Sequence, residues 1–139
     1  MTFQAKSTFA MLGILSAVYG WYFVVMFSTA RHTPVDQIIY QPLMIFITIP
    51  LVILAIFVHA IIAISAPREA GITDERDTLI TLRGEKIGGL VLGCGVFGGL
   101  VLAMFGGHTF WIAHTLLGSL VLAEIAAAAT MLILYRRGV

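Results

Sequence analysis

Two ionisable side chains, Glu124 and His59, lie inside long apolar runs and are the residues best placed to do chemistry. A charged side chain in the middle of a membrane span costs several kcal/mol, so such residues face protein or water and often mark proton or ion pathways. At about 1.5 Å of rise per residue, the two side chains would differ in depth by about 6 Å. They are predicted to form either a pathway for protons or cations, or a structural hydrogen bond that fixes the register of two helices.

The other histidines and the single cysteine offer little for a metal or a haem. His59 and His114 would differ in depth by well over ~10 Å, too much for one haem between them. His32, His108 and His114 lack the spacing of zinc ligands, and Cys94 alone builds neither a disulfide nor a multi-cysteine site. The chain also lacks a Ser–His–Asp arrangement, a phosphate loop and paired catalytic carboxylates. We therefore expect no cofactor, no metal and no enzyme activity.

These residues belong to a chain whose composition is typical of a membrane protein. Of its 139 residues, 60% are apolar and 11% are charged, with a mean hydropathy of +1.02. Soluble domains carry about 25% charged residues. The net charge of +1 and the scattered basic residues indicate no direct nucleic-acid binding.

Four long apolar runs, the fourth interrupted only by Glu124, are each long enough to cross a hydrocarbon core about 30 Å thick. The chain is therefore predicted to be a single all-α domain over residues 1–139, an integral membrane four-helix bundle. Pro42 lies near the start of the second span, and Pro50 is expected to kink or break its first turns. The predicted spans are residues 7–30, 42–66, 86–106 and 109–135.

The basic residues set the predicted orientation. Only Arg31 lies on one side of the four spans, and the other seven lie on the opposite side. The positive-inside rule then places both termini in the cytoplasm, as a multi-pass protein of the bacterial inner membrane. The seven residues are Lys6, Arg68, Arg76, Arg83, Lys86, Arg136 and Arg137.

A helix over residues 74–86 is predicted from the polar segment between the second and third spans. Pro67 ends the second span, and Thr73 or Asp74 is suited to the N-cap of a new helix. This helix is expected to continue without a break into the third span, which would extend it into the cytoplasm. Its charged residues are the candidates for binding a cytoplasmic protein: Asp74, Glu75, Arg76, Asp77 and Arg83.

Glycines at helical spacing mark the third span as a helix contact. Small residues four apart let helix backbones approach closely in lipid. The candidates for this packing are Gly88, Gly89, Gly93, Gly95 and Gly99. Packing within one bundle, self-association into a homo-oligomer and a glycine-lined pathway all remain open.

The segment Asp74-Glu75-Arg76-Asp77-Thr78-Leu79-Ile80-Thr81-Leu82-Arg83-Gly84 resembles a signature of the DUF2178 family of small multi-helix prokaryotic membrane proteins. The resemblance covers about a dozen residues ahead of the third span. Members of this family are described as uncharacterised and often occur beside helix-turn-helix regulators. The resemblance implies a membrane-anchored partner of a cytoplasmic protein, with the 74–86 helix as its contact element.

Three functions follow from these features. The first is a non-enzymatic membrane partner or regulator of other proteins that acts through the 74–86 helix. The second is a small oligomeric transporter or channel that uses Glu124 and His59. The third is an accessory subunit of a larger membrane complex. The sequence specifies no substrate, ligand, partner or oligomeric state.

Overall fold

The structure, a computed structural model, describes residues 3–65 and 75–137, and their regular structure is all helical. The surroundings of side chains are described for residues 12–53, 56–57 and 78–137. The all-α fold expected from the apolar runs is confirmed. In chain order the elements are α1 (Phe3–His32), the short 3-10 helix η1 (Val35–Gln37), α2 (Gln41–Ser65), α3 (Glu75–Met104) and α4 (Thr109–Arg137).

Three of the helices contain stretches that are long and apolar enough to cross a membrane. They are Leu12–His32 in α1, Thr78–Met104 in α3 and Thr109–Arg137 in α4. The apolar stretch found within the described part of α2 is shorter, Gln41–Ile53. The chain therefore has the character of a membrane protein with transmembrane helices, and the crossing by α2 stays a prediction.

Two features of the helices bear on the sequence predictions. The helix expected to start near residue 74 is seen as α3, which runs from Glu75 to Met104 without interruption. The break considered at Pro50 is absent, because this proline lies inside α2 with helix on both sides. Pro50 is exposed, so its ring lies on the outside of the molecule. Membrane helices tolerate such prolines better than soluble helices do.

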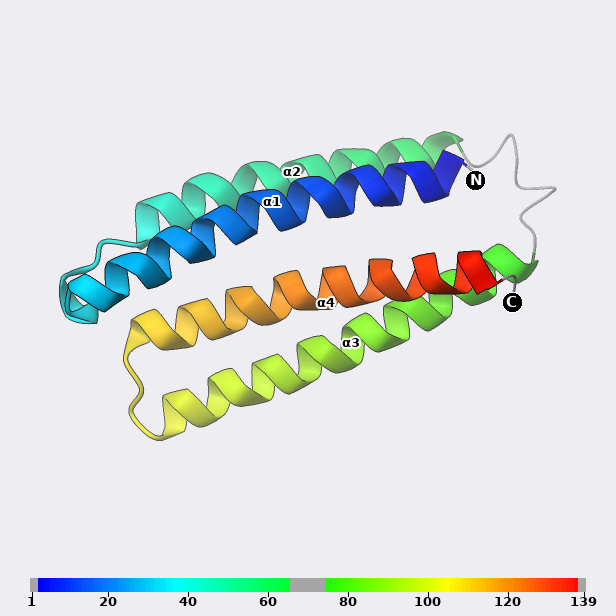
Figure 1. Cartoon of the computed structure of the whole chain (residues 1–139). Coiled ribbons are helices and arrows are strands. Elements are labelled where there is room, and N and C mark those ends of the chain that lie inside the picture. The colour runs from blue at the N-terminus through cyan, green and yellow to red at the C-terminus, as the bar shows by residue number, and fades with distance from the viewer. Residues whose placement is uncertain (1–2, 66–74, 138–139) are drawn as a thin grey trace.

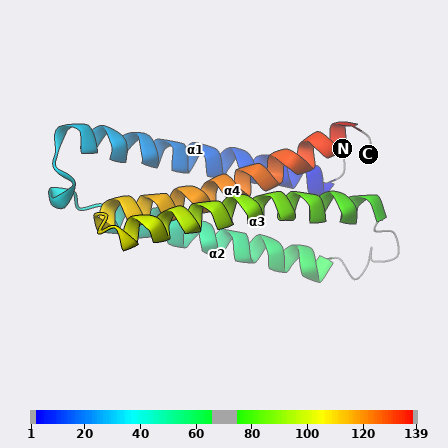
Figure 2. The same cartoon turned by 90° about the horizontal axis from the view of Figure 1, so that it is seen from below.

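The four helices run up and down, and the two ends of the molecule differ in character (Figures 1 and 2). The first residues of α1 and α3 and the last residues of α2 and α4 lie at one end, which we call the terminal end. The connection with η1 and the α3–α4 turn lie at the other, which we call the turn end. The terminal end carries Arg83, Lys86, Arg136 and Arg137, whereas Arg31 lies at the turn end.

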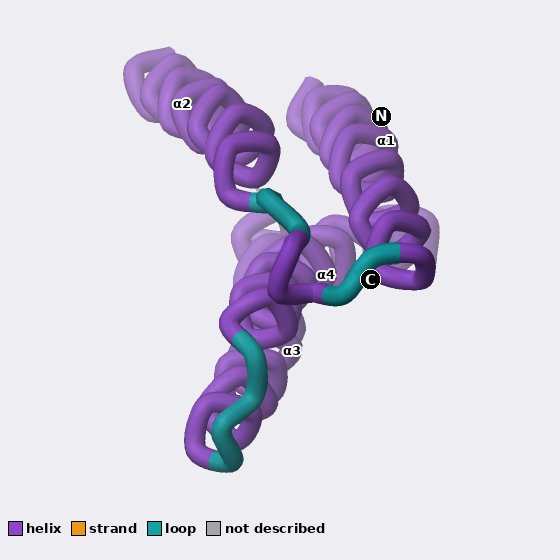
Figure 3. The backbone as a smooth tube through the Cα atoms, turned by 90° about the vertical axis from the view of Figure 1, so that its left-hand side faces the viewer, coloured by secondary structure: helices purple, strands orange, loops and turns teal. Residues whose placement is uncertain are grey.

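Helix α4 is central to the arrangement. Viewed along the helices from the turn end, α3 lies on one side of α4, while α1 and α2 diverge on the other (Figure 3). Close backbone contact is most extensive between α3 and α4, and α1 also contacts α4. The α3–α4 hairpin is therefore the most tightly packed unit, and α4 joins it to α1.

Small residues allow this close contact. A Cβ atom placed on Gly88 would lie 2.9 Å from the Ala123 carbonyl oxygen, and one on Gly95 would overlap Ser119 Cβ. A Cβ on Gly99 would lie 2.8 Å from Leu116 Cδ2. The side of α3 that faces α4 thus has no room for a larger residue at Gly88 and Gly95, whereas at Gly99 the end of the Leu116 side chain would have to move.

The α3–α4 turn is built on two glycines. Gly106 has a φ of +72°, the left-handed conformation that favours glycine at a helix end. The Gly107 N–H donates to the Leu102 carbonyl at 2.7 Å, and the Gly106 N–H donates to the Ala103 carbonyl at 3.2 Å. This pair of bonds forms a Schellman motif, which ends α3 and satisfies two of its last carbonyls.

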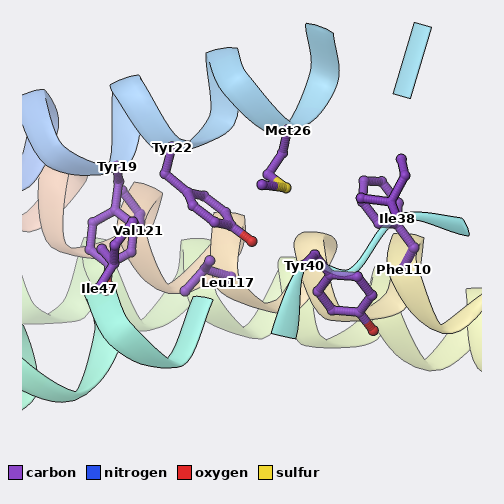
Figure 4. Close-up of a cluster of buried hydrophobic side chains, with 9 residues drawn as sticks. All are labelled: Tyr19, Tyr22, Met26, Ile38, Tyr40, Ile47, Phe110, Leu117 and Val121. Atoms are coloured by element: carbon purple, nitrogen blue, oxygen red, sulfur yellow. The ribbon is translucent and has the colours of Figure 1, made fainter. Parts of the chain in front are cut away.

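One cluster of buried apolar side chains joins α1, the α1–α2 connection, α2 and α4 (Figure 4). Every third or fourth residue of α1 contributes to it, with Tyr19, Tyr22 and Met26 buried on one face. Phe110 and Tyr22 are fully buried, with 0% exposure. The remaining members come from the α1–α2 connection, α2 and α4: Ile38, Tyr40, Ile47, Leu117 and Val121.

Candidate functional site

A buried histidine–tyrosine pair joins α1 to α4. His114 of α4 is only 3% exposed, and its Nε2 lies 3.0 Å from the hydroxyl oxygen of Tyr22 in α1. Its Nδ1 lies 2.7 Å from the Phe110 carbonyl oxygen, one turn earlier in α4. Both ring nitrogens therefore have partners within the protein.

These partners determine which nitrogen carries the hydrogen. A carbonyl oxygen can only accept, so Nδ1–H donates to Phe110. In the neutral ring Nε2 is then an acceptor, and the Tyr22 hydroxyl donates to it. His114 has no free nitrogen for a metal or haem iron while the Tyr22 bond is intact, so the pair acts as a link between two helices.

Aromatic rings enclose His114. The Phe110 ring is stacked on it at 4.0 Å between centroids, and the Tyr40 ring meets it edge-on at 5.2 Å. Phe23 and Phe27 of α1 also lie close to it, at 6.2 and 6.3 Å. Tyr22 is the partner that the described residues give to Nε2, so loss of its hydroxyl would leave a buried ring nitrogen without this bond.

The predicted pair of Glu124 and His59 is only partly described. His59 lies within α2, and its side chain falls outside the described residues. Glu124 is exposed on α4. Because Gly88 packs on Ala123 and Ala127, Glu124 lies within about one helical turn of Lys86 in depth, roughly 5 Å. Glu124 is thus central in its own helix but close to the level where the charged residues of α3 begin.

The predicted partner-binding segment is fixed in place where it is described. Asp74 lies outside the described residues. Glu75, Arg76 and Asp77 form the first turn of α3, although the surroundings of their side chains are not described. Further along, Arg83 is exposed, whereas Ile80 is 2% exposed.

A glycine holds the same segment against α4. A Cβ on Gly84 would lie 2.6 Å from Met131 Cγ and 2.9 Å from the Ala127 carbonyl oxygen. One side of this segment therefore packs on α4, and its other side is open.

The five glycines predicted to mediate packing fall into two groups. Gly88, Gly95 and Gly99 contact α4 within the chain, as described above. A Cβ atom placed on Gly89 or Gly93 would meet nothing within 4 Å, so these two glycines lie in open space. The first group packs the hairpin, and the second leaves small residues on its outer surface.

An apolar groove lies beside the histidine–tyrosine pair. It has α4 as its floor and α1 and α3 as its walls, and it holds about 830 Å³. Phe23 and Phe27 line it from α1, Cys94 lines it from α3, and His114 lies at its floor. Cys94 is exposed rather than packed in the protein interior.

A second histidine joins the two connections at the turn end. The Phe110 N–H donates to His108 Nδ1 at 3.2 Å, so His108 caps the first turn of α4. Its Nε2–H then donates to Asp36 Oδ1 of η1 at 2.6 Å. His108 therefore connects the η1 loop to the α3–α4 turn.

Sequence reasoning missed the Tyr22–His114 pair. The two residues are 92 positions apart, and nothing in the local pattern around either one points to the other. The usable signal is the face of α1 with Tyr19, Tyr22 and Met26 at helical spacing, which indicates a packed side. Among the residues whose side chains are described, 12–53, 56–57 and 78–137, no three His, Cys, Asp or Glu side chains gather at one point.

Comparisons with known proteins give no assignment. No protein-family model, curated protein or solved structure matches this chain.

Proposed function

We propose that the chain is an inner-membrane protein whose terminal end, with both chain termini, faces the cytoplasm. The distribution of basic residues in the fold supports this orientation. Arg83, Lys86, Arg136 and Arg137 lie together at the terminal end, and Arg31 is at the turn end. Cytoplasmic ends of membrane helices carry such an excess of basic residues. All four helices would cross the membrane, α2 included.

We further propose that the protein is a non-enzymatic partner or regulator of other proteins. It would act through residues 75–86, the part of α3 that we assign to the cytoplasm and call the cytoplasmic part of α3. The observation that carries this proposal is the two-sided character of that segment. Ile80 and Gly84 are buried, while Leu79, Leu82 and Arg83 are exposed. A helix held on one side and open on the other suits a protein partner, which would gain both apolar and charged contacts.

The packing also gives the segment a way to report on the rest of the protein. Gly84 and Gly88 hold α3 against α4, and the His114–Tyr22 bond ties α4 to α1. A partner bound to the cytoplasmic part of α3 would therefore contact an element that packs on α4, which is in turn bonded to α1. This continuity suits a regulator that senses the membrane-embedded helices.

Charge reversal at two exposed positions tests this function. Arg83→Glu together with Lys86→Glu should remove a protein partner captured by crosslinking in native membranes, measured by affinity purification and quantitative mass spectrometry. Both side chains are exposed, so the thermal stability of the purified protein should stay unchanged. Arg31→Glu, an exposed arginine at the opposite end, is the matched control and should retain the partner. Equal recovery of the same proteins from all three forms would reject the proposal.

A second candidate, a subunit of a homo-oligomer or larger membrane complex, is favoured by Glu124. This carboxylate is exposed on a candidate span, and no hydrogen bond or ion pair to it is seen among the described residues. A carboxylate facing lipid is costly, and a neighbouring chain would relieve that cost. Gly89, at a similar depth on α3, leaves room for a helix to approach. Glu124→Gln should weaken self-crosslinking or co-migration in mild detergent, and unchanged assembly would reject this candidate.

The transporter alternative would also depend on assembly. Glu124 is exposed in the single chain, so a path for protons or cations past it would have to form between chains. The test is pH-dependent flux in liposomes, which Glu124→Gln should remove. Flux no greater than that of empty vesicles would reject this alternative.

A further inference from the structure

The apolar groove between α1 and α3 has the dimensions of a lipid chain. It holds about 830 Å³ and extends along α4 from Trp111 to Ile125, roughly 21 Å at about 1.5 Å per residue. One leaflet of a bilayer has a hydrocarbon thickness of about 15 Å, half of the full core. An acyl chain entering at the turn end would thus lie in the groove and reach past the middle of the bilayer.

Two of the polar side chains that line the groove, His114 and Ser119, already have hydrogen-bond partners within the protein. Both ring nitrogens of His114 are bonded to Tyr22 and Phe110. The Ser119 hydroxyl donates to the Leu116 carbonyl at 2.8 Å. The groove therefore presents a mainly hydrocarbon surface to its occupant.

A positive charge lies one helical turn beyond the groove, toward the turn end. Phe27 lines the groove at the turn end, and Arg31 follows it by one helical turn on the same side of α1. Arg31 is exposed, and no ion pair involves it among the described residues. A guanidinium at this level would meet the phosphate of a lipid whose chain lies in the groove, because arginine binds phosphate with two parallel hydrogen bonds.

We propose that this groove binds an anionic phospholipid from the leaflet at the turn end, with one acyl chain between α1 and α3 and the phosphate on Arg31. The lipid would fill the space that separates α1 from α3 and so support the position of α1 on α4. This site is independent of the partner-binding segment, which lies at the terminal end.

Fluorescence quenching by brominated lipids tests the site directly, because one of the two tryptophans lines the groove. Trp111 is in the lining, whereas Trp21 is not. The Trp21→Phe protein, with Trp111 as its single fluorophore, is reconstituted into phosphatidylcholine vesicles. A small fraction of the lipid is replaced by brominated phosphatidylglycerol or, in parallel, by brominated phosphatidylcholine. The phosphatidylglycerol should quench Trp111 with an apparent affinity about fivefold higher, the ratio expected from one basic side chain at a membrane surface.

Three further substitutions in the same background separate a built site from ordinary lipid contact. Arg31→Gln should abolish the preference for the anionic lipid. Gly20→Leu, at a lining glycine with no atoms within 4 Å of a Cβ position, should fill the groove and reduce quenching by both lipids. Gly13→Leu, equally open but outside the groove lining, is the control and should change neither.

Equal quenching by the two brominated lipids in the Trp21→Phe protein would overturn the proposal. So would identical quenching in the Gly20→Leu and Gly13→Leu proteins, because the groove would then bind no lipid of its own. Neither result would bear on the partner-binding function, whose test uses substitutions at the other end of the molecule.

Discussion

Alanine at two neighbouring glycines of α3 should have opposite effects on stability. Alanine is favoured over glycine in a helix by about 1 kcal/mol, and this gain applies at both Gly88 and Gly89. A Cβ on Gly88 would lie 2.9 Å from the Ala123 carbonyl oxygen and 3.0 Å from Ala127 Cβ. A Cβ on Gly89 would meet nothing within 4 Å.

The magnitude follows from the atoms that the new methyl group would meet. The Ala123 oxygen belongs to the backbone of α4 and cannot turn aside as a flexible side chain would. Overpacking of this kind costs about 1–3 kcal/mol. Gly88→Ala should therefore lower the free energy of unfolding by as much as about 2 kcal/mol, whereas Gly89→Ala should raise it by as much as about 1 kcal/mol. The difference between the two, about 1–3 kcal/mol, is free of the helix-propensity effect that they share.

The assay is reversible unfolding in mixed micelles, with increasing SDS and with tryptophan fluorescence as the signal. The protein concentration must be low enough that the chain is monomeric, so that contacts between chains at Gly89 make no contribution. Equal shifts for the two variants, or a larger loss for Gly89→Ala, would refute the packing of α3 on α4 described above.

The other contacts give three further predictions, each measured by the same unfolding assay. Tyr22→Phe should lower the free energy of unfolding by about 1 kcal/mol, because His114 Nε2 loses its donor. The double variant Tyr22→Phe/His114→Phe should lose less than the sum of the two single variants, because both remove the same bond. Losses that add in full would argue against the bond. His108→Ala should lower the free energy of unfolding by about 1 kcal/mol, because the cap of α4 is lost. Asp36→Asn should lower it by less than about 1 kcal/mol, because the ion pair of Asp36 with His108 is exposed. Equal losses would argue against the cap. Gly106→Ala should lower the free energy of unfolding by about 1–2 kcal/mol, because a residue with a Cβ is strained in the left-handed conformation. No change in stability would contradict the turn geometry.

Much of the helical framework could be predicted from apolar runs and helix-end signals. The start of α3 near residue 74 follows from a proline that ends one run and acidic residues that favour the first turn of the next helix. The tight α3–α4 turn follows from Gly106 and Gly107. These signals are local, so a single sequence reveals them.

Which side of α3 each glycine faces is harder to predict from the sequence. Gly88 and Gly89 are adjacent and identical in type, yet one contacts α4 and the other lies in open space. All four helices are apolar around most of their circumference, so hydropathy does not show which side of a membrane helix faces protein. Only the register of α3 on α4 separates the two positions.

The candidate site is the least predictable feature. The sequence gives little reason to select His114, because its predicted depth in the membrane does not match that of His59. No local pattern points to Tyr22 either. Their hydrogen bond joins distant parts of the chain, and the groove beside it depends on how far α1 and α3 stand apart. Glu124 is identifiable from its rarity in an apolar run, but its exposed position required the structure.

Site-specific photo-crosslinking along the cytoplasmic part of α3 would test the proposed function most directly. A photoreactive amino acid is placed in living cells at Leu82, which is exposed, or at Ile80, which is 2% exposed and serves as the control. We predict crosslinks from Leu82 to one discrete protein partner, and crosslinks from Ile80 only within the chain. If Leu82 crosslinks to no protein, or if both positions yield the same products, the cytoplasmic part of α3 is not a partner-binding surface.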